Sequence, residues 1–161
     1  MGKLALGCVA ILVVVAVILL TGGGGSSHAK STASAAAKSS STGTGPKISQ
    51  RLTLTSTTPG SKTVAAVEIL SEGGKRAFYI AAEHLPPSRG FSYVIWLYNS
   101  PSSAEALTKA PTISSNERLA GGALLPENAS SFHEMLVTRE TSNKPTQPGP
   151  IALRGPFSLG G

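Results

Sequence analysis

Short runs of alternating apolar and polar residues fill the chain from residue 48 onward, and Gly or Pro separates one run from the next. Alternation with a period of two is typical of β-strands that bury one face. The pattern predicts strands at residues 50–57, 63–70, 76–83, 93–98, 118–125, 132–138 and 151–154. Residues 104–109 and 128–132 each fit one helical turn, and no stretch sustains a 3.6-residue period. The predicted fold class is all-β, an immunoglobulin-like β-sandwich of about seven strands.

Two local signals refine this prediction. Gly73-Gly74 lies between the second and third runs, which is the signature of a tight β-hairpin. The most apolar run, Tyr93–Tyr98 (YVIWLY), is expected to be a central strand. Its Trp96 is the single tryptophan of the chain. A ligand platform is one interpretation of Trp96, but an aromatic in the middle of a central strand favours a buried structural role.

A different pattern marks the N-terminus. Leu4–Leu20 (LALGCVAILVVVAVILL) carries no charge, and as a helix it would span roughly 25 Å, the short end of what a bilayer requires. Residues 1–20 are therefore expected to form one N-terminal transmembrane signal-anchor helix. The competing interpretation is a cleaved signal peptide, with small residues such as Ala33-Ser34-Ala35 as the cleavage site. That site lies more than ten residues past the apolar run, which favours an uncleaved anchor.

The segment after the apolar run is composed almost wholly of Gly, Ser, Thr and Ala. Such a composition offers nothing to bury in a core and predicts a flexible linker over residues 21–47. The predicted organisation is thus an anchor at 1–20, a linker at 21–47 and a β domain at 48–161.

The charge of the chain does not indicate a nucleic-acid partner. The formal net charge is +6, but from residue 47 onward eleven Lys or Arg face eight Glu, a balance of about +3. These cations are scattered singly, apart from the Lys75-Arg76 pair in a predicted turn. Binding to a phosphate backbone requires a clustered basic face, so no nucleic-acid binding is predicted.

The reactive side chains do not form a recognisable site. The chain has no Asp, and its only cysteine, Cys8, lies in the apolar N-terminal run. The neighbouring pairs Glu83-His84 and His133-Glu134 resemble acid–base or metal pairs, but adjacent residues of a strand point to opposite faces. Zinc needs three or four convergent ligands. We therefore predict no catalytic residues, no cofactor-binding residues, no metal ligands and no cofactor, and we expect a protein that is not an enzyme.

A series of short motifs resembles a known family. The series runs His84-Leu85-Pro86-Pro87, Tyr93-Val94-Ile95-Trp96-Leu97, Val137-Thr138-Arg139-Glu140 and Pro145-Thr146-Gln147-Pro148. In order and spacing it looks like the extracytoplasmic C-terminal domain of actinobacterial anti-sigma-K factors, over roughly residues 52–155. The resemblance implies a β-sandwich outside the membrane, and it supplies no catalytic residues to transfer.

The sequence also departs from that family. Full-length members look like a cytoplasmic sigma-binding domain, a membrane helix and this outer domain, whereas only Met1-Gly2-Lys3 precedes the helix here. We expect no sigma-binding activity from these residues. The predicted protein is a single-pass protein of the cell membrane, with a cytoplasmic N-terminus and an extracytoplasmic C-terminal domain for binding or sensing. The alternative is a cell-envelope structural or interaction protein that binds wall polymer or another envelope protein.

Overall fold

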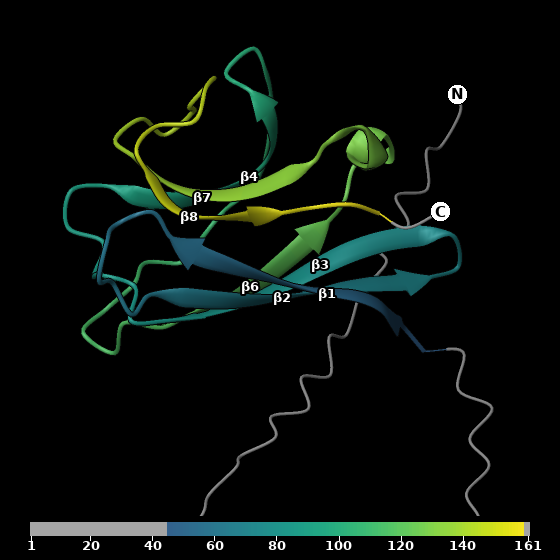
Figure 1. Ribbon diagram of the computed structural model, residues 1–161, viewed down its shortest axis with the longest axis horizontal. Coiled ribbons are helices and arrows are strands. Elements are labelled where there is room, and N and C mark those ends of the chain that lie inside the picture. Colours follow the sequence, from purple (N-terminus) through teal and green to yellow (C-terminus); the bar gives the residue numbers. More distant parts are fainter. Residues whose placement is uncertain (1–44, 160–161) are drawn as a thin grey trace, which may run out of the picture. The chain divides into compact units, whose positions relative to one another are not determined.

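The computed structural model describes residues 45–159, and the predicted anchor and most of the predicted linker lie outside this range. The described part is all-β and contains no α-helix (Figure 1). Its elements are β1 (Lys47–Ser56), β2 (Val64–Glu72), β3 (Lys75–Glu83), β4 (Ser92–Ser100), β5 (Ser103–Lys109), β6 (Leu119–Leu124), the 3₁₀ helix η1 (Glu127–Ser131), β7 (Glu134–Glu140) and β8 (Ile151–Pro156). All seven predicted strands are present, with ends that differ by a few residues.

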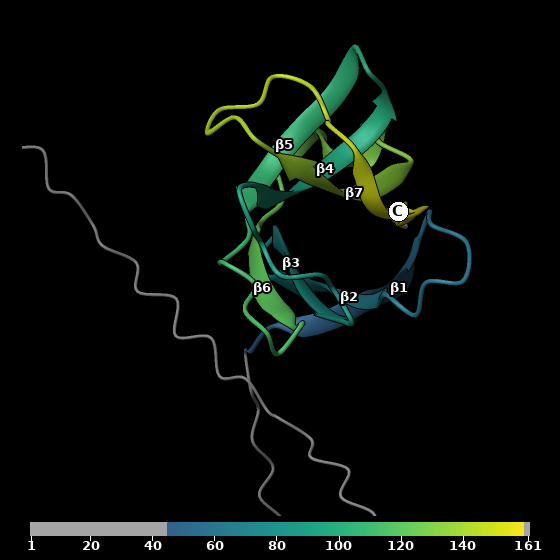
Figure 2. The ribbon, with the colours of Figure 1, turned by 90° about the vertical axis from the view of Figure 1, so that its left-hand side faces the viewer.

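The strands form one antiparallel sheet in the order β5-β4-β7-β8-β1-β2-β3-β6. Figure 2 shows that this sheet folds over into two layers, with β5, β4 and β7 in one and β1, β2, β3 and β6 in the other. The layers are joined where β8 meets β1, and only Thr55–Arg154 and Ser56–Leu153 pair there. Gly155 allows this close approach, because a Cβ atom at that position would lie under 3.0 Å from the carbonyl oxygen of Thr53.

The main core fills the space between the layers. On β2 and β3 the inward positions alternate with exposed ones, as the period of a strand requires. Both layers contribute fully buried side chains, among them Leu54, Val67 and Ile80 from one layer and Tyr93, Leu97 and Leu153 from the other. Burial of this apolar area at about 25 cal/mol per Å² is the main force that holds the two layers together.

The β2–β3 hairpin confirms the turn predicted at Gly73-Gly74. Glu72 pairs with Lys75 across the turn, and the two glycines have φ angles of 55° and 78°. Positive φ at both central residues is the requirement of a type I′ turn, which matches the twist of the flanking strands. Gly meets this requirement without the steric cost that other residues would incur.

The domain has eight strands in its described residues, one more than predicted. Residues 104–109, expected as one helical turn, belong to β5 and pair with β4. Ala, Glu, Leu and Lys in this segment favour a helix locally, but pairing with β4 provides hydrogen bonds that an isolated turn cannot. The second predicted turn, at residues 128–132, is confirmed as the 3₁₀ helix η1.

Trp96 is buried, as predicted, with only 1% of its surface exposed. It does not lie in the main core, however, because Tyr93, Ile95 and Leu97 occupy the inward positions of β4. Trp96 packs with Val94 and Leu136 in a second, small cluster on the other side of that layer. The central strand β4 therefore buries both faces.

Candidate functional site

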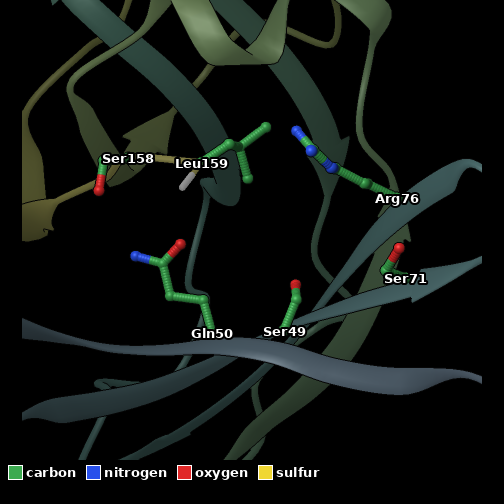
Figure 3. Close-up of a pocket in the computed structure, with 6 residues that line it drawn as sticks. All are labelled: Ser49, Gln50, Ser71, Arg76, Ser158 and Leu159. Carbon is green, nitrogen blue, oxygen red and sulfur yellow. The ribbon is translucent and has the colours of Figure 1, made fainter. Parts of the chain in front are cut away.

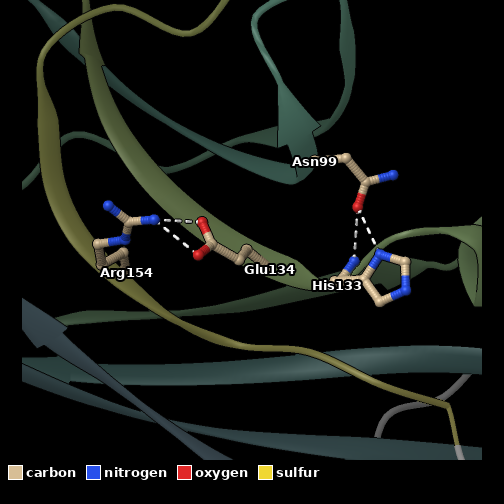
Figure 4. A network of polar contacts seen from close by, with 4 residues as sticks. All are labelled: Asn99, His133, Glu134 and Arg154. Atoms are coloured by element: carbon tan, nitrogen blue, oxygen red, sulfur yellow. Dashed lines mark hydrogen bonds and ion pairs between the residues drawn. The ribbon is translucent and has the colours of Figure 1, made fainter.

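The histidines that the sequence singled out lie at the ends of strands and are exposed. His84 follows β3 in the left-handed region, with φ of 57°. His133 precedes β7, and both its backbone N–H and its ring Nδ1 approach the side-chain oxygen of Asn99, at 2.9 and 2.8 Å (Figure 4). Neither position combines a histidine with a second reactive group.

The glutamates beside these histidines have other partners. Glu83 lies 3.5 Å from Arg118, and Glu134 accepts two hydrogen bonds from Arg154 at 2.5 and 2.6 Å (Figure 4). Each of these glutamates is thus paired with an arginine, and the histidine beside it lies just outside the strand. Within residues 45–159, no group of three His, Cys, Asp or Glu side chains could hold a metal ion.

Asn99 explains the position of His133. Its amide nitrogen donates to the carbonyl oxygen of Ser131 at 2.9 Å, while its oxygen accepts from His133. The side chain therefore connects the end of β4 to the segment between η1 and β7. This arrangement therefore holds two backbone segments together.

A recess between the layers is the better candidate for a site (Figure 3). It has a volume of about 340 Å³, near the lower limit of the clefts that hold small ligands. Three segments of chain enclose it, namely the start of β1, the β2–β3 hairpin and the residues after β8. The lining residues are Ser49, Gln50, Ser71, Arg76, Ser158 and Leu159.

The recess forms because the inward positions of the hairpin change from apolar to polar toward its turn. Ile69 pairs with Phe78, and both side chains are buried in the main core. The next inward pair is Ser71 with Arg76. A β-bulge in β1 between Ile48 and Gln50 brings two successive residues, Ser49 and Gln50, to the same opening.

Of the described residues that line the recess, Arg76 alone is charged. Figure 3 shows its side chain pointing into the opening, toward the side where Leu159 lies. Among residues 45–159 its guanidinium has no hydrogen-bond or ion-pair partner. The other polar groups around it are the hydroxyls of Ser49, Ser71 and Ser158 and the amide of Gln50. Within residues 45–159, the recess therefore presents one positive charge, several neutral hydrogen-bonding groups and no carboxylate.

This site was not identified from the sequence, although the position of Arg76 in the alternating pattern of β3 indicates part of it. The sequence pattern places Arg76 with Lys75 in a predicted turn, at the start of the predicted strand 76–83. In the structure Arg76 lies two residues before Phe78 and four before Ile80, on the same inward face of β3. Alternation alone would have placed Arg76 at the open end of that face. The approach of Ser158 and Leu159 has no comparable signal, because it depends on how the chain continues after β8.

Comparison with known protein families, curated proteins and solved structures found no match to this chain. The resemblance to the anti-sigma-K outer domain accordingly remains a prediction. No helix within residues 45–159 is long and apolar enough to cross a membrane.

Proposed function

We propose that this protein is a membrane-anchored, extracytoplasmic binding or sensing protein without enzymatic activity. The observation that carries the proposal is the recess, in which the unpaired Arg76 faces the opening among neutral polar groups. An unpaired cation with several hydrogen-bonding neighbours is suited to hold a ligand, whereas acid–base or nucleophilic chemistry needs a second reactive group. The anchor and the location outside the membrane rest on the apolar segment at residues 4–20.

An immunoglobulin-like fold is part of this proposal, and the strand order supports it. One layer has the order β5-β4-β7-β8, which corresponds to C′-C-F-G of such sandwiches, and the other contains β2-β3-β6, which corresponds to A-B-E. The strand β1 would then be an addition at the edge of the second layer. One departure concerns the tryptophan: in antibody domains the strand C tryptophan lies between the sheets, whereas Trp96 lies in the second cluster.

The proposed relationship to the anti-sigma-K outer domain gains a structural rationale. The Tyr93 hydroxyl donates to the Pro86 carbonyl oxygen at 2.9 Å, and Trp96 donates to Thr138 at 2.8 Å. Thr138 in turn donates to Glu140. Residues from three of the four motifs thus contact one another, which favours a shared fold as the reason for the motif series. A regulatory role is proposed only by analogy with that family.

Labelling of a single exposed cysteine tests the topology. In a Cys8→Ser background, Ser102→Cys places a thiol in the exposed turn between β4 and β5. A membrane-impermeant maleimide added to intact spheroplasts is expected to label this variant, and the cysteine-free parent serves as the control. Labelling that appears only after lysis would contradict an extracytoplasmic domain.

A second candidate function is a cell-envelope interaction protein that binds wall polymer or another envelope protein. The outward face of the β1-β2-β3-β6 layer favours it, since Ile48, Val64 and Leu124 are 46%, 40% and 53% exposed there. Ile48 and Leu124 lie in one cross-strand row with Leu70 and Ala77. Co-sedimentation of the protein with purified wall, lost in an Ile48→Ser/Leu124→Ser variant, would favour this function over the first.

A further inference from the structure

We propose that the recess binds an oxyanion group, a carboxylate or a phosphate, on a small hydroxylated molecule the size of a single sugar. This inference rests on the proposed binding function and specifies its ligand. It is drawn from the set of groups that line the opening, which is one guanidinium, three hydroxyls, one carboxamide and one leucine side chain.

The charge of the ligand follows from Arg76. A guanidinium presents its N–H donors in a planar fork that matches the two oxygens of a carboxylate or phosphate. Since no carboxylate among residues 45–159 lines the recess, the fork can accept an external anion without displacing a partner from this part of the chain. A neutral ligand would leave this donor set only partly used.

The hydroxyl groups of the ligand follow from the serines and Gln50. The hydroxyl of Ser49 donates to the carbonyl oxygen of Ile69 at 3.2 Å, so its oxygen remains able to accept a hydrogen bond. The amide of Gln50 both donates and accepts. Around the anion site the recess therefore offers acceptors as well as donors, which suits a molecule with several hydroxyl groups better than a bare anion.

The size of the ligand follows from the volume. A recess of about 340 Å³ is too small for most of an oligosaccharide or peptide to enter. Leu159 provides one apolar contact on the side where Figure 3 shows it facing the opening. The expected occupant is one hexose-sized unit, either free or at the end of a longer chain.

Three matched hexoses test the proposal on the full-length protein in non-ionic detergent micelles. The probes are D-glucose, D-glucuronate and D-glucose 6-phosphate, and the readout is the NMR shift of the Ser49, Ser71 and Ser158 amides and of the Arg76 side-chain N–H. Glucuronate or glucose 6-phosphate is expected to shift these signals in a saturable way, and which of them does so identifies the oxyanion. Glucose is expected to shift them weakly or not at all.

Variants assign the effect to Arg76. The Arg76→Ala variant is expected to bind the anionic probe at least tenfold more weakly, and Arg76→Lys should restore only part of the loss because an ammonium lacks the planar fork. Lys75→Ala is the matched control, since it removes the same charge from the neighbouring position, which does not line the recess. It should retain the affinity of the unaltered protein.

The outcomes separate this inference from the proposed function. Equal binding of glucose and the anionic probes would overturn the oxyanion class while leaving a binding domain. An equal loss in Lys75→Ala and Arg76→Ala would mean that only overall charge attracts the probe, and it too would overturn the proposal. If none of the three hexoses shifts the recess signals at millimolar concentration, the recess is not the site proposed here. The cysteine-labelling result stands independently of all three.

Discussion

At the scale of single residues, the most constrained group is the hydroxyl of Thr138. It is fully buried, accepts the indole N–H of Trp96 at 2.8 Å and donates to Glu140, which also accepts from the backbone N–H of Gly149 at 2.7 Å. Glu140 is itself 7% exposed. The side chains of Trp96, Thr138 and Glu140 are all buried away from water, so Trp96 and Glu140 depend on the Thr138 hydroxyl for a hydrogen bond.

Thr138→Val is therefore expected to lower the free energy of unfolding by about 1–3 kcal/mol, although valine has nearly the same shape. The substitution leaves the Trp96 N–H unpaired and removes one donor from the Glu140 carboxylate. Thr138→Ser is the control, because it retains the hydroxyl and loses only a methyl group. Urea unfolding measures both, and a Val variant as stable as the Ser variant would argue against the role of the hydroxyl.

Tyr93 gives the second prediction at this scale. Burial raises the pKa of its phenol above the ordinary value of 10.0, and the nearby Arg139 opposes this increase. Because the folded state favours the neutral phenol, its contribution to stability is complete below pH 10 and is lost as the pH rises above that value. The free energy of unfolding should fall more steeply above pH 10 in the unaltered protein than in Tyr93→Phe. Parallel pH profiles for the two proteins would contradict this assignment.

At the scale of elements, β6 contains two neighbouring glycines that differ in the space available for a side chain. A Cβ atom at Gly122 would lie under 3.0 Å from the Phe78 carbonyl oxygen, whereas one at Gly121 would meet nothing within 4 Å. Backbone on β3 cannot move aside as a flexible side chain could. The two positions therefore form a matched pair within one strand.

Gly122→Ala is expected to destabilise the domain by about 1–3 kcal/mol, the usual cost of forcing extra atoms into a packed site. Gly121→Ala should be neutral or stabilising by a few tenths of a kcal/mol to about 1 kcal/mol, because alanine reduces the freedom of the unfolded chain. Thermal unfolding of the two variants side by side provides the measurement. Equal midpoints would show that β6 shifts to accept the methyl group.

Some of the strands in this protein could be predicted from the sequence pattern, and others could not. Strands with clear alternation, such as β2 and β3, could be predicted because one face is buried and the other is solvated. The strand β5 could not, since its local preference is helical and its pairing partner β4 determines its conformation. The second cluster around Trp96 could not be predicted either. A continuous apolar run does not indicate which face of the sheet each of its residues occupies.

The residues of the candidate site also divide into one that strand alternation predicts and others that tertiary packing places. The inward direction of Arg76 follows from the alternation of β3, so this part of the site was predictable in principle. The bulge at Ser49 and the approach of Ser158 depend on tertiary packing and leave no local pattern. Motif searches are of little use here, because the lining residues are common polar types at unremarkable spacings.

At the scale of the whole molecule, the question is whether the two layers unfold together. They share the main core, but hydrogen-bonded pairing between them is limited to the short contact of β8 with β1. Phe157 strengthens the connection: its side chain is 2% exposed within that core, and its backbone N–H donates to the His133 carbonyl oxygen at 2.7 Å. The segment after β8 thus contributes to the core shared by both layers.

Phe157→Ala is expected to lower the free energy of unfolding by about 3–5 kcal/mol, and Phe157→Leu by less, because the alanine variant leaves a larger cavity. Trp96 lies outside the main core, in the second cluster, and is the sole tryptophan, so its fluorescence reports on the layer that contains β4. If the domain is a single cooperative unit, the fluorescence and far-ultraviolet circular dichroism transitions will shift together by the same amount. A shift of the dichroism transition alone would mean that the layer containing Trp96 keeps its structure after the shared core has opened. The hydrogen bonds within that layer, including those at Thr138, would then be sufficient to stabilise it.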